Sequence, residues 1–235
     1  RGSAAANIVN GKVYVMGGAT TADGSKDVAI SNATTANNLT RNDIYDIASN
    51  TWSSGAPMAL PRNHMFSGTV NGKIYIIGGR VGHAFVAASQ NTDIVEQYDP
   101  ATNTWGPQMA KMPTARSGGG WGTYGGKIYV AGGEVATNSL VGAFRAVEAF
   151  DPATNSWAIM PSMPMPRHGV AGAMIGNKVH LVSGMITAAA ARAGQDPTGG
   201  VHVAQHDIPE LPGGGTKQKP RRPFGHHEEH EKPKL

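Results

Sequence analysis

The sequence contains no cysteine, few charged residues and no long apolar run. Without cysteine, its 235 residues can form no disulfide, no thiolate metal site and no cysteine nucleophile. Charged residues make up 15% of the chain, well below the usual share of about 25%. No apolar run approaches the ~18 residues of a membrane span. No membrane span is therefore predicted.

Glycine is abundant, with 32 residues in the chain. Helices tolerate glycine poorly, so this composition favours short strands joined by tight turns. The formal net charge is +4, but residues 213–235 alone hold six Lys or Arg against three Glu. Because the remaining body is nearly neutral, we expect no nucleic-acid partner.

An internal repeat runs along the chain. Apolar runs end in paired glycines at VYVMGG (13–18), IYIIGG (74–79) and IYVAGG (128–133), with a weaker version, HLVSG (180–184). An arginine lies 17 residues before the last glycine of each run, which places the repeat starts at Arg1, Arg62, Arg116 and Arg167. Such constant offsets around one segment of variable length indicate a repeat architecture.

A second marker of the repeat is an Asp followed six residues later by a Trp. The segments are YDIASNTW (45–52), YDPATNTW (98–105) and FDPATNSW (150–157). Catalytic groups are usually unique in a chain, whereas these residues recur once per unit. We therefore interpret Asp46, Asp99 and Asp151 as turn residues that accept backbone hydrogen bonds. The tryptophans supply apolar area for contacts between units.

Each unit is predicted to form a four-stranded antiparallel sheet. Asn10-Gly11, Asn71-Gly72, Gly125-Gly126 and Gly176-Asn177 lie between the first two strands and suit two-residue hairpin turns. The second strand ends at the glycine pair, the third ends at the repeat Asp, and the Trp opens the fourth. Because one such sheet cannot bury both faces, neighbouring units must stack.

These residues resemble the kelch repeat over Arg1 to about Pro212. The resemblance implies an all-β fold, a β-propeller of four-stranded antiparallel blades with repeats starting at 1, 62, 116 and 167. Residues 213–235 are predicted to be a disordered tail. The structural repeat positions include Arg62, Arg116, Arg167, Gly78, Gly79, Gly132, Gly133, Asp99, Asp151, Trp52, Trp105 and Trp157.

The fourth unit departs from the pattern. It has Ser183-Gly184 for the glycine pair and Gln205-His206-Asp207 for the Tyr-Asp, and no Trp follows. Four units are also fewer than the six or seven blades usual in closed kelch rings. The sequence favours the C-terminal part of a longer propeller over a four-bladed ring or an open array that associates with itself.

Carboxylates lie three residues before each repeat Asp, at Asp43, Glu96 and Glu148. Their constant register predicts that Arg62, Arg116 and Arg167 pair with such carboxylates, within or between blades, as partly buried bidentate bridges.

Ligand-binding residues are expected on the variable loops between the second and third strands, which should emerge on one face. The candidates are His64, Arg80, His83, Arg145 and Arg192. His64 is included because, in ligand-binding kelch domains such as ubiquitin-ligase adaptors, the position two after the repeat Arg faces the ligand. Here Ser3, His64, Gly118 and Gly169 occupy that position.

The leading hypothesis is a non-catalytic binding module for a protein, peptide or glycan, with no cofactor and no metal. HHEEH (226–230) lacks the spacing of a zinc-protease helix. The alternative is part of a kelch-fold enzyme whose catalytic residues lie partly outside this chain. A galactose-oxidase-like carbohydrate oxidase would need a Cys, which is absent. A sialic acid mutarotase would need convergent acid and base groups, for which His64, Glu134 and Arg145 are the loose candidates.

Overall fold

The fold was examined in a computed structural model, which describes residues 1–20, 37–81, 90–136, 140–186, 203–208 and 211. The regular elements in these ranges are all β-strands, as predicted. The described residues include no helix long and apolar enough to cross a membrane. The predicted tail, 213–235, lies outside them.

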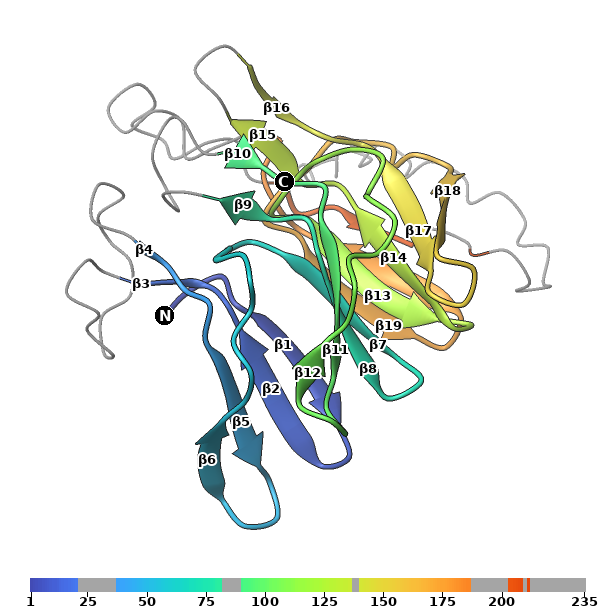
Figure 1. Cartoon of the computed structure of the whole chain (residues 1–235). Helices are drawn as coiled ribbons and strands as arrows, with labels where there is room; N and C mark the ends of the chain where they lie inside the picture. Colours follow the sequence, from blue (N-terminus) through green and yellow to red (C-terminus); the bar gives the residue numbers. More distant parts are fainter. Residues whose placement is uncertain (21–36, 82–89, 137–139, 187–202, 209–210, 212–235) are drawn as a thin grey trace, which may run out of the picture.

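The strands form four blades of a propeller, arranged in chain order (Figure 1). Blade A contains β1 (Ala5–Val9), β2 (Lys12–Met16), β5 (Asn42–Asp46) and β6 (Thr51–Ser54). Blade B contains β7 (Phe66–Val70), β8 (Lys73–Ile77), β11 (Val95–Asp99) and β12 (Thr104–Trp105). Blade C contains β13 (Gly120–Tyr124), β14 (Lys127–Ala131), β17 (Val147–Asp151) and β18 (Ser156–Met160).

Blade D is smaller than the other three. Its described strands are β19 (Ala171–Ile175), β20 (Lys178–Val182) and β21 (His206–Asp207), which form a three-stranded antiparallel sheet. This agrees with a degenerate last repeat. Neighbouring strands in all four blades pair antiparallel.

Three short hairpins extend from the same side of the propeller, at the end of each second strand (Figure 1). They are β3 (Ala19–Thr20) with β4 (Asn37–Asn38), β9 (Arg80–Val81) with β10 (Gln90–Asn91), and β15 (Glu134–Ala136) with β16 (Val141–Ala143). We call this side the loop end. The opposite side, which carries the Asp–Trp turns, is the turn end.

The turn end is built from the same few residues in blades A, B and C. Asn71 and Gly72 have φ of 49° and 74°, the left-handed pair that a two-residue hairpin turn requires. In the DPATN turn, Asp99 Oδ1 accepts the Ala101 amide at 3.0 Å. Lys73 Nζ lies 2.8 Å from Asp99 Oδ2, and this contact and the amide hydrogen bond lower the Asp99 pKa. The repeat Asp is thus a turn residue, as predicted.

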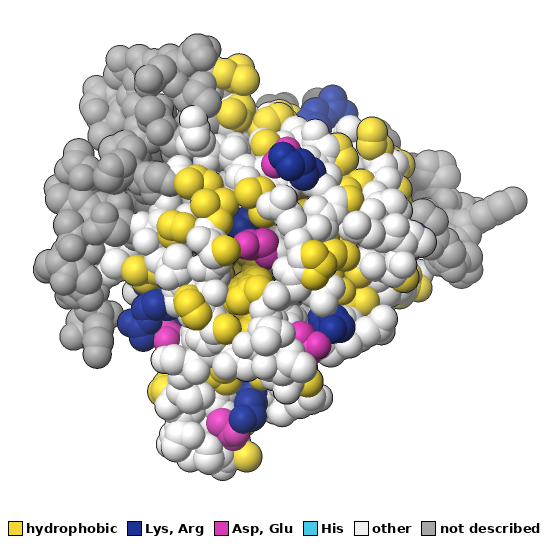
Figure 2. Space-filling view, in the orientation of Figure 1, with side chains coloured by type: hydrophobic (Ala, Val, Ile, Leu, Met, Phe, Trp, Pro, Cys, Tyr) yellow, Lys and Arg dark blue, Asp and Glu magenta, His cyan; other side chains and the backbone are white. Residues whose placement is uncertain are grey.

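Equivalent lysines pair with the other two turn aspartates, Lys12 with Asp46 and Lys127 with Asp151. Figure 2 shows several positively and negatively charged side chains lying side by side on the viewed face, surrounded by uncharged atoms. This lysine was not predicted, although it directly follows the glycine of each hairpin turn.

The hydrophobic core lies between blades. One cluster joins Tyr14 and Met16 of blade A to Ile74, Ile76 and Tyr98 of blade B. The next two clusters join blade B to blade C and blade C to blade D in the same way. The face of one blade therefore packs against the opposite face of the next, and the buried clusters of the described residues all span two blades.

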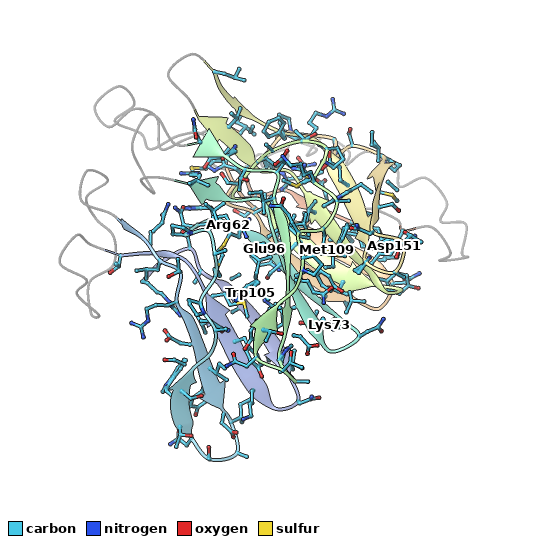
Figure 3. The ribbon with its side chains drawn as sticks, in the orientation of Figure 1. Arg62, Lys73, Glu96, Trp105, Met109 and Asp151 are labelled. Carbon is cyan, nitrogen blue, oxygen red and sulfur yellow. The ribbon has the colours of Figure 1, made fainter. Side chains whose placement is uncertain are left out.

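The repeat arginines Arg62, Arg116 and Arg167 are fully buried inside the blades and Arg1 is partly buried, each beside a carboxylate. Arg62 pairs with Glu96 (Figure 3), and Arg116 pairs with Glu148. Arg1 pairs with Asp43 in the same way. The predicted pairing is confirmed, and all of these pairs lie within a blade.

The bridges differ from the predicted bidentate geometry. Arg62 donates one guanidinium nitrogen to Glu96 and the other to the backbone carbonyls of Gly78, at 3.1 Å, and Ile94, at 3.2 Å. Carbonyls just after the second strand and just before the third strand compete for the guanidinium, so a two-point contact with the carboxylate is lost.

The predicted role of Asp207 was wrong. Asp207 was aligned with the turn aspartates, but it pairs with Arg167 and so occupies the position of Glu96 and Glu148. Leu181 of β20 pairs with Asp207, just as Val130 pairs with Glu148. Gln-His-Asp resembles the Tyr-Asp marker in sequence. The strand register, however, places Asp207 three positions earlier in the repeat, at the position of the carboxylate that pairs with the repeat Arg.

Candidate functional site

Two positions in every blade meet at the loop end. The residue after the repeat Arg forms an isolated antiparallel bridge with the residue after the glycine pair. The four bridges are Gly2–Ala19, Asn63–Arg80, Ser117–Glu134 and His168–Met185. These positions differ in chemistry from blade to blade, unlike the repeat residues around them.

The next residue along each blade connects neighbouring blades through the main chain. The His64 amide donates to the Ser3 carbonyl at 2.9 Å, Gly118 to His64 at 2.9 Å, and Gly169 to Gly118 at 2.6 Å. All four residues have positive φ, between 52° and 69°. The hydrogen bonds form an arc across blades A to D, which brings the adjacent side chains together.

A buried ion pair crosses from blade B to blade C within this arc. Arg80 pairs with Glu134, and its Nε donates to Ser117 Oγ at 3.1 Å. Burial lowers the pKa of Arg80 to about 10, so the side chain stays charged at neutral pH. Two buried charges require such close pairing to offset their lost hydration.

The network continues into blade D. His168 Nδ1 lies 3.4 Å from Glu134 Oε2, and both side chains are buried. Arg80, Glu134 and His168 therefore form a chain of charged or ionisable groups over three successive blades. We call these three residues, with Ser3, Asn63, His64 and Ser117, the loop-end cluster.

His64 is the partly exposed histidine of the cluster. Its Nδ1 lies beside Asn63 Oδ1, and its Nε2 is 3.1 Å from Ser3 Oγ. Since the amide oxygen only accepts, Nδ1 carries the hydrogen and Nε2 accepts from the serine hydroxyl. Burial, followed by the positive charges of Arg80 and His168, lowers the pKa of His64 to about 3. The ring is neutral at physiological pH.

The loop hairpins are attached to the cluster at their bases. Asn63 Nδ2 donates to Asn38 Oδ1 of β4 at 2.5 Å. Asn91 Nδ2 of β10 donates to the Glu134 carbonyl at 2.6 Å. These bonds hold the second strands of two hairpins against the cluster.

The structure brings together only part of the predicted ligand-binding set. His64 and Arg80 both belong to the cluster. Arg145 contacts a different segment, because its Nε donates to the Met163 carbonyl at 2.7 Å. His83 and Arg192 lie outside the described residues. Of the loose trio His64, Glu134 and Arg145, Glu134 contacts Arg80 and His168.

Asn63, Ser117 and His168 were missed by sequence reasoning. The ligand-binding prediction used the second residue after each repeat Arg. These three residues lie one position earlier, directly after the Arg. A signal in the sequence could have found them. The repeat Arg is the same in all four units, whereas the residue directly after it changes from Gly to Asn, Ser and His.

Comparison with known proteins agrees with this architecture. Residues 1–184 match the family described as the KLHDC2/KLHL20/DRC7 Kelch-repeats domain. The chain belongs to the kelch-repeat family.

Individual relatives extend the similarity. The chain is 28% identical to Kelch-like protein terF of Aspergillus terreus over 222 residues, which cover 93% of this chain and 44% of that protein. It is 30% identical to Kelch-like protein 25 of Xenopus tropicalis over 177 residues, covering 74% and 27%. The chain thus spans less than half the length of these two relatives.

A solved structure, that of YjhT, shares the fold. It superposes with a TM-score of 0.62 at 21% sequence identity, covering 78% of this chain and 57% of YjhT. At this identity the likeness concerns the fold alone.

Proposed function

We propose that this kelch-repeat chain is a non-catalytic binding module, and that a protein or peptide partner docks on its loop end. Kelch-repeat propellers are typically protein-interaction modules. The observation that carries the proposal is the loop-end cluster, where side chains that differ between blades are held together on a shared backbone arc.

The cluster has a contact layer and a supporting layer. Ser3 and His64 are partly exposed, whereas Asn63, Arg80, Ser117, Glu134 and His168 are buried. The buried groups fix the orientation of the two exposed ones, so their rotamers are set before a ligand arrives. Such preorganisation lowers the entropic cost of binding.

The ligand that suits this surface offers neutral hydrogen-bonding groups. His64 is uncharged, and Arg80 is engaged by Glu134 and Ser117. An extended peptide segment, with its main-chain N–H and C=O groups, fits this chemistry. Loops at the hairpins would add contacts around it.

The enzyme alternative fits the cluster less well. A general base works best with a pKa near the operating pH, whereas the pKa of His64 is about 3. The Glu134 carboxylate contacts both Arg80 and His168. These contacts favour a positioning role for Glu134.

The test compares both ends of the propeller. Partners are identified by affinity capture, and their affinity for each variant is then measured. We expect wild type and Lys73→Ala, which alters the turn end, to bind these partners equally well. His64→Ala should lose at least about tenfold in affinity, because it removes the packing surface of the ring and the hydrogen bond that orients the Ser3 hydroxyl.

The opposite outcome is equally defined. Partners that bind His64→Ala and wild type alike, but not Lys73→Ala, would move the site to the turn end. Mutarotation of sialic acids by the wild-type chain, abolished in His64→Ala, would replace the binding module with an enzyme.

A further inference from the structure

Two histidines of blade D contact each other across neighbouring strands. His180 of β20 places its Nδ1 2.9 Å from Nε2 of His206 in β21, and the ring centroids are 5.1 Å apart. Val182 of β20 pairs directly with His206, and alternate residues of a strand point to the same side. Both rings therefore lie on one face of the sheet. His206 is exposed and His180 is partly exposed.

His180 stands where the other blades have a tyrosine in the second strand. β20 begins with a lysine, as β2, β8 and β14 do. Two residues after that lysine the four blades have Tyr14, Tyr75, Tyr129 and His180. The three tyrosines are buried. Blade D thus replaces a buried phenol ring with an imidazole that solvent can reach.

His206 also replaces a residue type that recurs. It directly precedes the carboxylate that pairs with the repeat Arg, as do Val95 in blade B and Val147 in blade C. Both valines are buried. Histidine therefore enters blade D at two positions whose rings are in contact, as a two-residue ligand set requires.

The separation of the two nitrogens fits a transition-metal ion. Imidazole nitrogens bind such ions at about 2.0–2.1 Å, so two ligands at right angles around one ion are about 2.9 Å apart. That is the distance between His180 Nδ1 and His206 Nε2. Right-angled nitrogen ligands are typical of the square-planar and tetragonal sites of Cu²⁺ and Ni²⁺.

The residues beside the pair leave room for an ion. Ala173 of β19 lies directly opposite His180, and its side chain is a single methyl group. Among the residues that the structure describes, no group of three or more His, Asp or Glu side chains is placed to hold a metal. The two imidazoles are therefore the protein ligands that this part of the chain offers, and water completes the coordination.

We propose that His180 and His206 bind a late divalent transition-metal ion, Cu²⁺ or Ni²⁺, on the sheet face of blade D. The expectation of no metal site came from motif spacing. These two histidines are 26 residues apart, and the pairing of β20 with β21 brings them together. Neither belongs to the loop-end cluster, so the metal site is separate from the proposed partner site.

Metal binding replaces the hydrogen bond between the rings. In a neutral imidazole one nitrogen carries a hydrogen and the other has a free lone pair. Without metal, one ring donates its N–H to the other. With metal, His180 Nδ1 and His206 Nε2 must both present lone pairs, so the donor ring adopts its other tautomer. Both rings stay neutral, and no net proton is lost from them.

The test uses variants that restore the residues of the other blades. His206→Val introduces the residue of blades B and C, and His180→Tyr introduces the tyrosine of blades A to C, so both should preserve the sheet. Calorimetric titration of the full chain with Cu²⁺ should show at least about tenfold weaker binding for each variant, because even the loss of a partner of a metal ligand costs about 10–100-fold. Val182→Ala, on the same face, is the matched control and should bind as wild type does.

The electron paramagnetic resonance spectrum of the bound Cu²⁺ identifies its ligands. It should show two imidazole nitrogens in wild type and fewer in His206→Val. Replacing His226, His227 and His230 by alanine tests the histidine-rich tail separately and should leave the two-nitrogen spectrum unchanged. Equal affinities and equal spectra for wild type and His206→Val would overturn the proposal. Loss of the two-nitrogen spectrum in the tail variant would do the same.

NMR of wild type gives an answer that requires no substitution. Because bound Cu²⁺ is paramagnetic, a substoichiometric amount should broaden the backbone amide signals of β20 and β21 before those of blades A to C. Earlier broadening in any other blade would contradict the proposed site. Mg²⁺, which prefers oxygen ligands, should shift none of the β20 and β21 signals, and equal shifts with Mg²⁺ would argue against imidazole ligands.

Discussion

Buried ion pairs occur in two regions of this molecule, and they are organised differently. The repeat pairs, such as Arg62–Glu96, lie within single blades and recur in all four. The loop-end pair Arg80–Glu134 joins two blades and has no equivalent residues at Ala19 or Met185. The recurring pair stabilises each sheet, whereas the unique pair orients a surface. Residues that recur in every blade therefore stabilise the fold, whereas residues that occur in one blade only determine the chemistry of the surface.

The largest effect is expected from breaking a repeat pair. Glu96→Gln should leave the fully buried charge of Arg62 without a counter-charge, which destabilises the fold by about 3–5 kcal/mol even though the Gly78 and Ile94 carbonyls still accept its hydrogen bonds. Urea unfolding at pH 7 measures this loss. Asp93→Asn is the control, because its pair with the exposed Lys111 is worth at most about 1 kcal/mol. Equal unfolding midpoints for Glu96→Gln and wild type would contradict the role of the pair.

A smaller loss is expected at the loop end. Glu134→Gln should cost about 2–3 kcal/mol, because Arg80 keeps its hydrogen bond to Ser117 and its side chain, unlike that of Arg62, retains slight exposure to solvent. Adding Arg80→Gln removes the unpaired charge, so the double variant should be more stable than the sum of the single changes predicts. Strict additivity in urea unfolding would show that the two side chains do not interact.

His64, in the loop-end cluster, should make the free energy of unfolding depend on pH. Its folded pKa, about 3, lies below the unfolded value near 6.5. The unfolded chain therefore binds the proton first, and the contribution of His64 to stability is lost as pH falls from 6.5 towards 3. Between pH 6.5 and 5 the loss is up to about 2 kcal/mol.

The measurement compares unfolding free energies of wild type and His64→Gln across that pH range. His64→Gln should show a shallower decline, while Glu96→Gln should keep the wild-type contribution of His64. Parallel pH profiles for wild type and His64→Gln would show that His64 does not titrate on unfolding as inferred.

The smallest effect is expected at the turn end. Lys73→Ala removes an exposed contact with Asp99, and the turn retains the hydrogen bond from the Ala101 amide. We expect an unfolding midpoint indistinguishable from wild type by thermal denaturation. A clear loss of stability would mean that the turn end contributes as much as the buried pairs.

The repeat made the blades predictable from sequence. Constant offsets identified the strands, hairpins, turn aspartates and partners of Arg62 and Arg116, because every blade repeats the same short-range geometry. Asp207 was misassigned because the preceding Gln-His resembled a degraded Tyr motif, and only strand register distinguishes the two positions.

The loop-end cluster was harder to predict, for a physical reason. Arg80, Glu134 and His168 come from three blades and contact one another only after those blades have stacked. No pairwise spacing encodes such contacts. His64 and Arg80 were nominated individually, but their shared support through Asn63 and Ser117 depends on the tertiary arrangement.

The backbone arc through Ser3, His64, Gly118 and Gly169 also bears on how such a propeller diversifies. A side chain built on Gly118 would first meet Glu134 at 3.6 Å, and one on Gly169 would meet Met185 at 3.9 Å. Both are ordinary contact distances, so space is available, and asparagine tolerates the left-handed backbone there. A single codon change at either glycine can thus alter the chemistry presented to a partner while the blades beneath keep their sequence, which lets recognition evolve separately from folding.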